Sequence, residues 1–161
     1  MEEGKIIKYE NRGLQKVNTA ISITNKLLFV NLEPINIFWL EDHKIFFDGA
    51  SQCILKKFPN AIFNNIQNGD EALQYLINYN YKSILIDLII TDHNHPGKKG
   101  IDFAKAIRQL EIDKINKIPI LFITMVDDRN FVKDIEDIHL AKHLTKTTSC
   151  EEIIFTINNI I

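Results

Sequence analysis

Residues 83–100, SILIDLIITDHNHPGKKG, carry the pattern that best indicates the fold class. Its first half, Ser83 to Thr91, is apolar except for Asp87, as expected of a strand that is covered on both faces. Its second half becomes polar at Asp92 and ends at Gly100, where an amphipathic stretch begins. Strands covered on both faces are typical of parallel sheets flanked by helices, so this segment predicts a strand and a helix of an α/β domain.

The same alternation of apolar runs and amphipathic stretches continues in both directions. Further strands are predicted over residues 35–40, 61–66, 118–124 and 140–145. Helical spacing of apolar residues predicts helices over 44–58, 128–138 and 150–161, one starting at 100, and one opening at 70 that buries Leu73, Leu76 and Ile77. Five strands that are each followed by a helix predict an α/β fold, a doubly wound five-stranded parallel sheet with helices on both faces.

The composition is that of a soluble globular protein. Of the 161 residues, 45% are hydrophobic and 25% are charged, with 19 Lys and Arg against 21 Asp and Glu. The net charge of −2 argues against direct nucleic acid binding, because a phosphate backbone is held by excess positive charge. No apolar run approaches the roughly 20 residues of a membrane span, and the N-terminus lacks the pattern of a signal peptide. We therefore expect no membrane partner.

Two cysteines, Cys53 and Cys150, are too few for a disulfide framework and match no metal-binding spacing. So few cysteines are most simply explained by a reducing compartment, so the predicted localisation is cytoplasmic. Cys53 is expected to be an ordinary core residue.

Residues 1–33 are predicted to be an N-terminal extension to a domain that spans residues 34–161. A four-turn helix would fit the 3-4-3-4 spacing of Leu14, Val17, Ile21, Thr24 and Leu28. Parts of the same segment would also pass as short strands. Such a helix would cover part of the domain or, in the alternative interpretation, would join two copies into a homodimer.

Polar side chains stand where the predicted strands end, and in a parallel sheet those ends share one edge. They are Glu41, Asp42, Asp92, Thr124 and Lys146. Mg²⁺ prefers oxygen ligands, and a divalent cation would relieve the repulsion among the three carboxylates. An ionised aspartate beside Mg²⁺ can attack phosphorus and form an acyl phosphate, while a hydroxyl and an ammonium group bind the phosphoryl oxygens. This edge is therefore predicted to be a magnesium and phosphoryl site.

These positions resemble the receiver domain of two-component response regulators over about residues 34–161. An acidic pair closes the first strand, a proline and a glycine follow the phosphoacceptor aspartate at fixed distances, and a Thr and a Lys end the last two strands. The matching residues are Glu41, Asp42, Asp92, Pro96, Gly100, Thr124 and Lys146. Asp87 matches a second acidic position of the family rather than the phosphoacceptor.

The resemblance implies a CheY-like, flavodoxin-like fold of strand order 2-1-3-4-5. It implies that a sensor histidine kinase or a histidine phosphotransfer protein phosphorylates Asp92 in the presence of Mg²⁺ or Mn²⁺. Asp42 and Asp92 would ligate the metal, Glu41 would act through water, and Asn94 would offer its backbone carbonyl. The chain would catalyse its own phosphorylation and dephosphorylation without being a conventional enzyme.

Phosphorylation would draw Thr124 inward, engage Lys146 and switch a protein-binding face. No effector domain follows the last predicted helix, so we expect a single-domain response regulator. Its output would be the binding of a downstream protein target, with no direct contact to nucleic acid.

Several residues depart from the receiver pattern. Met125 stands where the family has a small residue, so it could restrict access to the site. His93 and His95 replace apolar residues beside Asp92, and His143 takes the position of the aromatic residue that reports the switch. The alternative hypothesis is thus an atypical receiver that binds its partner without phosphorylation. His43, His93 and His95 could also gather around a transition metal or tune the acidic pocket by titration.

Two other site chemistries fit the sequence poorly. A flavin or nucleotide site on this fold needs a loop that offers N–H groups to phosphate after the first strand, where this chain has Glu41 and Asp42. A hydrolase built on an Asp-x-Asp motif is excluded because Asn94 stands two residues after Asp92.

Overall fold

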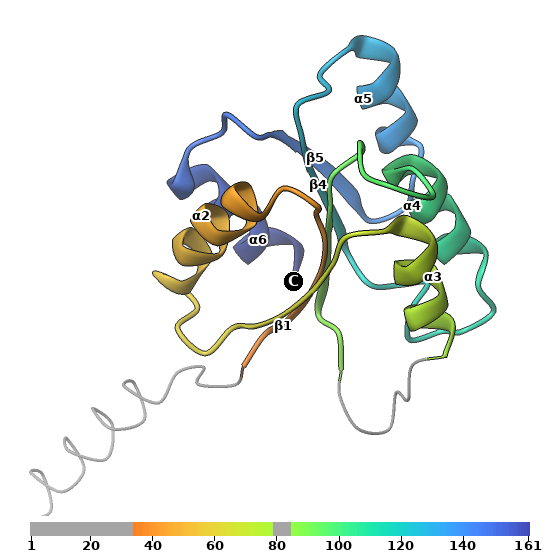
Figure 1. Cartoon of the computed structure of the whole chain (residues 1–161), viewed down its shortest axis with the longest axis horizontal. Coiled ribbons are helices and arrows are strands. Elements are labelled where there is room, and N and C mark those ends of the chain that lie inside the picture. Colours follow the sequence, from red (N-terminus) through yellow and green to blue (C-terminus); the bar gives the residue numbers. More distant parts are fainter. Residues whose placement is uncertain (1–33, 79–84) are drawn as a thin grey trace, which may run out of the picture. The chain divides into compact units, whose positions relative to one another are not determined.

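The computed structural model describes residues 34–78 and 85–161 of the chain. Over these residues the chain forms a five-stranded parallel sheet in the order β2-β1-β3-β4-β5 (Figure 1). The predicted fold class and strand order are confirmed. The predicted N-terminal extension, residues 1–33, lies outside the described residues, together with its helical and dimerising interpretations.

Strands and helices alternate along the described chain, as the apolar pattern predicts. The strands are β1 (Asn36–Leu40), β2 (Ile62–Ile66), β3 (Leu88–Thr91), β4 (Ile120–Thr124) and β5 (Ala141–Thr145). The helices are α2 (Lys44–Leu55), α3 (Gly69–Ile77), α4 (Gly100–Gln109), α5 (Arg129–Glu136) and α6 (Cys150–Ile160). None of these helices is both long and apolar enough to cross a membrane.

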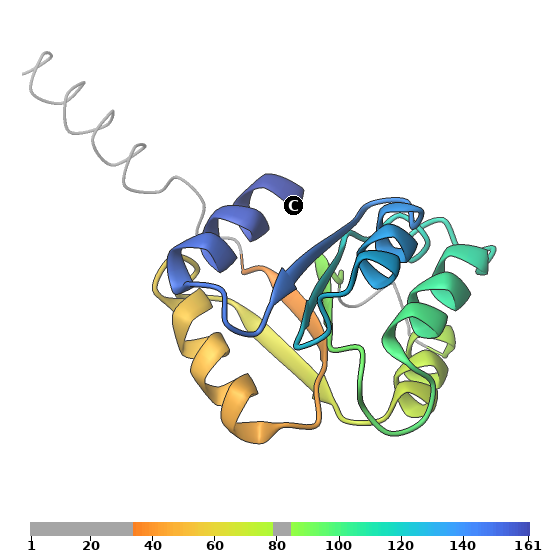
Figure 2. The same ribbon diagram turned by 90° about the horizontal axis from the view of Figure 1, so that it is seen from above.

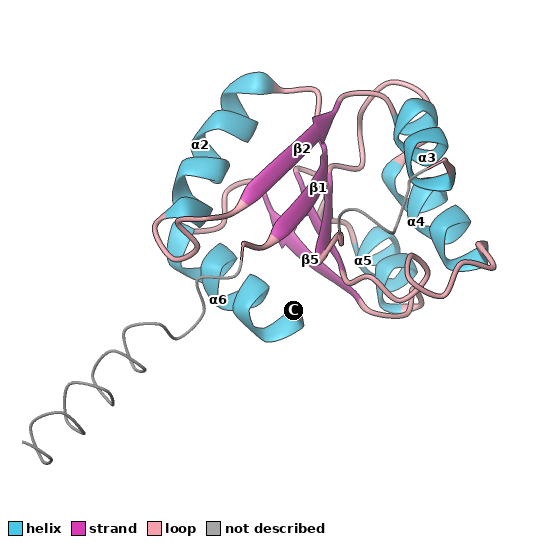
Figure 3. Cartoon of the chain, turned by 90° about the horizontal axis from the view of Figure 1, so that it is seen from below, coloured by secondary structure: helices cyan, strands magenta, loops and turns pink. Residues whose placement is uncertain are grey.

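Helices cover both faces of the sheet. Figures 2 and 3 show α2 and α6 on one face and α3, α4 and α5 on the other. Successive β1 side chains enter the two cores in turn, with Trp39 in the core of α2 and α6 and Phe38 in that of the other three helices. Because β1, β3 and β4 are buried on both faces, they read as continuous apolar runs, whereas the edge strand β5 is only partly buried.

The strand predicted over residues 83–91 is shorter in the structure. β3 begins at Leu88, and the three preceding described residues form no strand. Asp87 is held instead by Asn36, whose backbone N–H donates to the Asp87 carboxylate over 2.8 Å. This side-chain bond at the start of β1 explains the polar residue that interrupts the apolar run.

The structure also differs from the prediction in two helices. α2 ends at Leu55, because the N–H groups of Lys56 and Lys57 donate to carbonyls three residues earlier and tighten the last turn. Leu76 and Ile77 of α3 were both predicted to be buried; Leu76 is buried, but Ile77 is 39% exposed at the end of the helix.

Cys53 in α2 and Cys150 in α6 form a disulfide, with their Cα atoms 5.6 Å apart. The number of cysteines did not predict this bond. It forms because α2 and α6 pack side by side on the same face of the sheet (Figure 3). Cys53 is buried as expected, but the pairing removes the cysteine count as an argument for a reducing compartment.

Leu140 precedes β5 with a φ of 56°, in the left-handed region that favours glycine. Its carbonyl accepts a hydrogen bond from the N–H of Ile120 over 2.9 Å, so the unusual conformation lies where β5 starts to pair with β4. The side chain of Leu140 is 47% exposed.

Candidate functional site

Strand register places the predicted site residues at one edge of the sheet. Leu40, the last residue of β1, is level with Thr91 of β3, and the N–H of Asp92 donates to the Leu40 carbonyl over 3.0 Å. Thr124 and Thr145 end β4 and β5 at the same level, and Lys146 follows directly. The carboxylates after β1 and β3 therefore meet the hydroxyl and ammonium groups of the other strands.

The Lys146 ammonium joins two buried carboxylates. Its Nζ lies 2.7 Å from Oε2 of Glu41 and 2.8 Å from Oδ2 of Asp92. It also lies 4.6 Å from the ring centroid of Phe46 in α2, a cation–π geometry. The backbone N–H of Lys146 donates to the Thr124 carbonyl over 2.9 Å. Both the backbone and the side chain of Lys146 are therefore held by neighbouring groups. Sequence analysis placed Phe46 only on the apolar face of a helix and did not predict its contact with Lys146.

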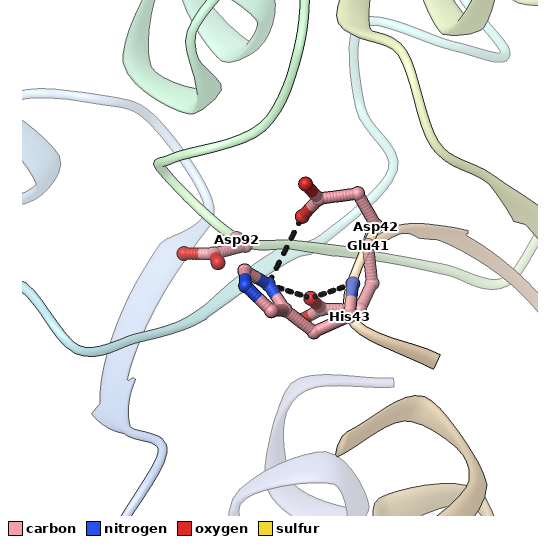
Figure 4. A group of neighbouring side chains, drawn as sticks. All are labelled: Glu41, Asp42, His43 and Asp92. Carbon is pink, nitrogen blue, oxygen red and sulfur yellow. Dashed lines mark hydrogen bonds and ion pairs between the residues drawn. The ribbon is translucent and has the colours of Figure 1, made fainter. Parts of the chain in front are cut away.

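Four side chains surround a candidate metal position. One ligand atom from each of Glu41, Asp42, His43 and Asp92 lies within 4.8 Å of the others (Figure 4). Nδ1 of His43 is 3.1 Å from a carboxylate oxygen of both Glu41 and Asp42. Three carboxylates against the single ammonium of Lys146 leave excess negative charge, which suits a divalent cation.

Asp92 is only 4% exposed, and its surroundings favour the ionised form. Burial by itself would raise the pKa of this carboxyl group. Hydrogen bonds from Lys146 and Thr124, together with the lysine charge, outweigh burial and hold the pKa of Asp92 below its ordinary value. The backbone N–H groups of His93 and Asn94 also donate to Oδ1. Asp92 is therefore a carboxylate at neutral pH.

A cavity of about 810 Å³ opens beside these groups. Its polar wall includes Asp92, Thr124 and Lys146. Its apolar wall comes from α2 and α6 and includes the disulfide. Met125 also lines the cavity and is 67% exposed, so its side chain stands at the opening rather than in the core.

The histidines do not gather as one interpretation predicted. Only His43 joins the carboxylates in the described part of the chain. The His93 ring packs against Phe131 of α5 with centroids 4.7 Å apart, and burial lowers its pKa despite the nearby Asp92 carboxylate. His95 is buried with Nδ1 3.1 Å from the Pro96 carbonyl.

His143 lies at the far end of a row of three rings that meet edge to face. Phe131 lies between His93 and His143, with a centroid distance of 5.6 Å to the His143 ring. Nε2 of His143 is 3.1 Å from the carbonyl of Val126. The N–H of Val126 in turn donates to Oγ1 of Thr124 over 3.4 Å. A chain of contacts through Val126 thus connects Thr124 to His143. Sequence inspection missed Phe131, the central ring of the row.

Comparison with known proteins identifies the family pattern over most of the chain. The family model described as the response regulator receiver domain matches residues 37–158. The transcriptional regulatory protein DegU of Brevibacillus brevis is 23% identical over 125 residues, covering 78% of this chain and 49% of that protein. The chemotaxis protein CheY-3 of Vibrio cholerae is 40% identical over 62 residues, covering 38% of this chain and 45% of that protein. The chain thus spans about half the length of these curated relatives.

Solved structures share the fold at lower sequence identity. The phosphorylated cyanobacterial phytochrome response regulator RcpA has a TM-score of 0.65 at 20% identity, over 80% of this chain and 91% of that one. The Mn²⁺-bound response regulator Rcp1 has a TM-score of 0.59 at 21% identity, over 79% of this chain and 91% of that one.

Proposed function

This chain belongs to the response regulator receiver domain family of two-component signalling, and from that premise we propose that it is a switch operated by phosphorylation of Asp92. The phosphoryl donor is a sensor histidine kinase or a histidine phosphotransfer protein. The observation that carries the proposal is the Asp92 carboxylate, which is ionised, bonded to Lys146 over 2.8 Å, and on the wall of a cavity.

The residues present fit a divalent metal. Glu41, Asp42 and Asp92 would supply carboxylate oxygens. The backbone carbonyl of Asn94, which the family resemblance implies, would complete the protein ligands. Bound Mg²⁺ or Mn²⁺ would neutralise the negative charge that accumulates when a phosphoryl group approaches these carboxylates. Glu41 is fully buried. Among the described residues, its cationic neighbours are Lys146 and, when protonated, His43.

In the transfer step a carboxylate oxygen of Asp92 attacks phosphorus, and the bond between phosphorus and the donor's imidazole nitrogen breaks. The product is an acyl phosphate on Asp92. Lys146 then exchanges its contact with the Asp92 carboxylate for a phosphoryl oxygen, and the Thr124 hydroxyl binds another. Asp92 needs no general base, because it is already ionised.

The switch follows the contact chain from Thr124 to His143. When the Thr124 hydroxyl turns to the phosphoryl group, it loses the hydrogen bond from the Val126 N–H. Val126 holds His143 through its carbonyl, so β5 and α5 respond together. This is a shift between two arrangements driven by their different affinity for the phosphoryl group.

The output is the binding of a downstream protein at the face formed by α5 and β5. Some similar proteins are transcription regulators, but the net charge of −2 does not suit this chain itself to nucleic acid. We propose that the protein acts in the cytoplasm, with residues 1–33 as an extension of the receiver domain. An atypical receiver that acts without phosphorylation is not favoured, since Asp92, Thr124 and Lys146 all line the same cavity.

The test is the intact mass of the full chain after incubation with Mg²⁺ and acetyl phosphate or a phosphorylated histidine kinase. We expect one added phosphoryl group in the wild type and none in Asp92→Asn. Asp87→Asn is the matched control, since it changes an aspartate of the same segment that bonds Asn36, and it should be labelled like the wild type. Persistent labelling of Asp92→Asn, or no labelling of the wild type by either donor, would contradict the proposal.

A further inference from the structure

The disulfide occupies a place that the proposed function does not use. Cys53 lies in α2, and Cys150 is the first residue of α6. Both line the cavity whose polar wall holds Asp92 and Lys146. Cys53 is 8% exposed, whereas Cys150 is partly exposed. A small molecule in the cavity therefore reaches the pair from the same side as it reaches the phosphoacceptor.

The disulfide also completes a closed path of backbone segments, one covalent cross-link and one ion pair beside that cavity. α2 begins shortly after Glu41, and its third turn carries Cys53. The disulfide crosses to Cys150, from which three residues lead back to Lys146. The Lys146 ammonium completes the path at 2.7 Å from the Glu41 carboxylate. A displacement of any one of these groups is therefore transmitted to the others through the covalent bonds and the ion pair.

We propose that Cys53 and Cys150 are a reversible thiol–disulfide site whose redox state controls phosphoryl transfer to Asp92. The inference rests on the proposed function, because its consequence is a change in phosphorylation. An incoming phosphoryl group must draw Lys146 away from Glu41 and Asp92. With the disulfide formed, the short segment between Lys146 and Cys150 is tied covalently to α2. With two thiols this covalent tie is absent, and the segment is restrained by packing between α2 and α6 and by hydrogen bonds such as that from the Thr148 N–H to the Thr145 carbonyl over 3.0 Å. Lys146 therefore moves more freely.

The chemistry of the site balances with a peroxide as oxidant and a dithiol as reductant. The Cys150 thiolate attacks the peroxide O–O bond, giving a sulfenic acid and water. The Cys53 sulfur then attacks that sulfenic sulfur, so that the disulfide forms and a second water leaves. For reduction, a dithiol attacks the disulfide, and its second thiol resolves the mixed disulfide. Two electrons and two protons return to the cysteines, and the dithiol becomes a disulfide.

The test uses the full chain, equilibrated under native conditions with hydrogen peroxide or with dithiothreitol. Thiol alkylation followed by intact mass reports the redox state, and acetyl phosphate with Mg²⁺ then reports the rate of Asp92 phosphorylation. We expect complete and reversible interconversion, and phosphorylation about threefold or more faster in the dithiol form. Cys150→Ser should be phosphorylated at the dithiol rate under both conditions. Cys53→Ala should behave in the same way. Agreement between the two variants would show that the result does not come from a folding defect of one of them.

Two results would overturn the inference. One is a disulfide that native dithiothreitol treatment does not reduce, which would make the bond purely structural. The other is an equal phosphorylation rate in the two redox forms. If neither form is phosphorylated, the proposed function itself fails. In that case the redox inference is tested by amide hydrogen exchange of residues 146–150. It requires faster exchange in the dithiol form than in the disulfide form, and equal exchange would overturn it.

Discussion

The ammonium nitrogen of Lys146 lies 2.8 Å from Oδ2 of Asp92, although β4 separates the strands that these residues follow. The same nitrogen contacts Glu41, so one lysine joins the ends of β1, β3 and β5. Removing it would leave two buried carboxylates without their shared cation. The stability of this edge and its response to a phosphoryl group therefore depend on the same side chain.

Lys146→Ala should destabilise the metal-free protein by about 3 kcal/mol, because it strands buried carboxylates. Saturating Mg²⁺ should restore most of this loss, since a divalent cation replaces the missing charge. Urea unfolding with and without Mg²⁺ measures both effects. Lys142→Ala, an exposed change in β5, is the control and should alter little. A Lys146→Ala protein as stable as the wild type in chelator would contradict the assigned contacts.

The lowered pKa of Asp92 gives a stability contribution with a defined sign. Burial opposes ionisation, but hydrogen bonds from Lys146 and Thr124 prevail, so the pKa of Asp92 in the folded protein lies below its ordinary value of 3.8. The contribution is fully present above the unfolded pKa and is lost as the pH falls through the folded one. The stability advantage of the wild type over Asp92→Asn should thus shrink at acidic pH in the presence of a chelator. Denaturant unfolding at a series of pH values tests this, and a difference that does not vary with pH would refute it.

His93 should produce a pH dependence of the same sign as that of Asp92, but at higher pH. Burial lowers its pKa below 6.5, so the unfolded chain takes up the proton before the folded chain does. Stability should therefore fall as the pH drops below about 6.5 toward the folded value. His93→Gln should lose this part of the pH dependence. NMR titration of the ring and denaturant unfolding across this range measure it, and an unchanged dependence in the variant would show that another group is responsible.

Leu140→Gly should stabilise the protein by about 0.5–1 kcal/mol. Leucine at a φ of 56° is strained, and glycine relieves that strain at a smaller cost in chain entropy. The exposed leucine side chain contributes little burial that would be lost. Leu140→Ala is the matched control, because it shortens the same side chain but keeps the strained backbone, and it should show no gain in thermal or denaturant unfolding. Equal stabilisation by alanine would remove backbone strain as the reason.

The local pattern of apolar residues predicted a strand or helix correctly where the faces of that element are clearly either buried in a core or exposed. The apolar runs of β1 and β4 and the amphipathic face of α4 needed no knowledge of the rest of the chain. It was a poor guide at boundaries. The start of β3 depends on the bond between Asn36 and Asp87, and the exposure of Ile77 depends on where α3 ends. Both are decided by neighbours that a window of adjacent residues does not contain.

The succession of strands and helices along the chain and the residues at the carboxyl ends of the strands were predictable from the amino-acid pattern alone. This follows because a parallel sheet brings those ends to one edge whatever the details of packing. Three contacts depend on the packed fold: Lys146 contacts both Glu41 and Asp92, Phe131 lies edge to face between His93 and His143, and Cys53 pairs with Cys150. These contacts join side chains from separate elements, so they depend on helix packing and rotamers rather than on any local periodicity.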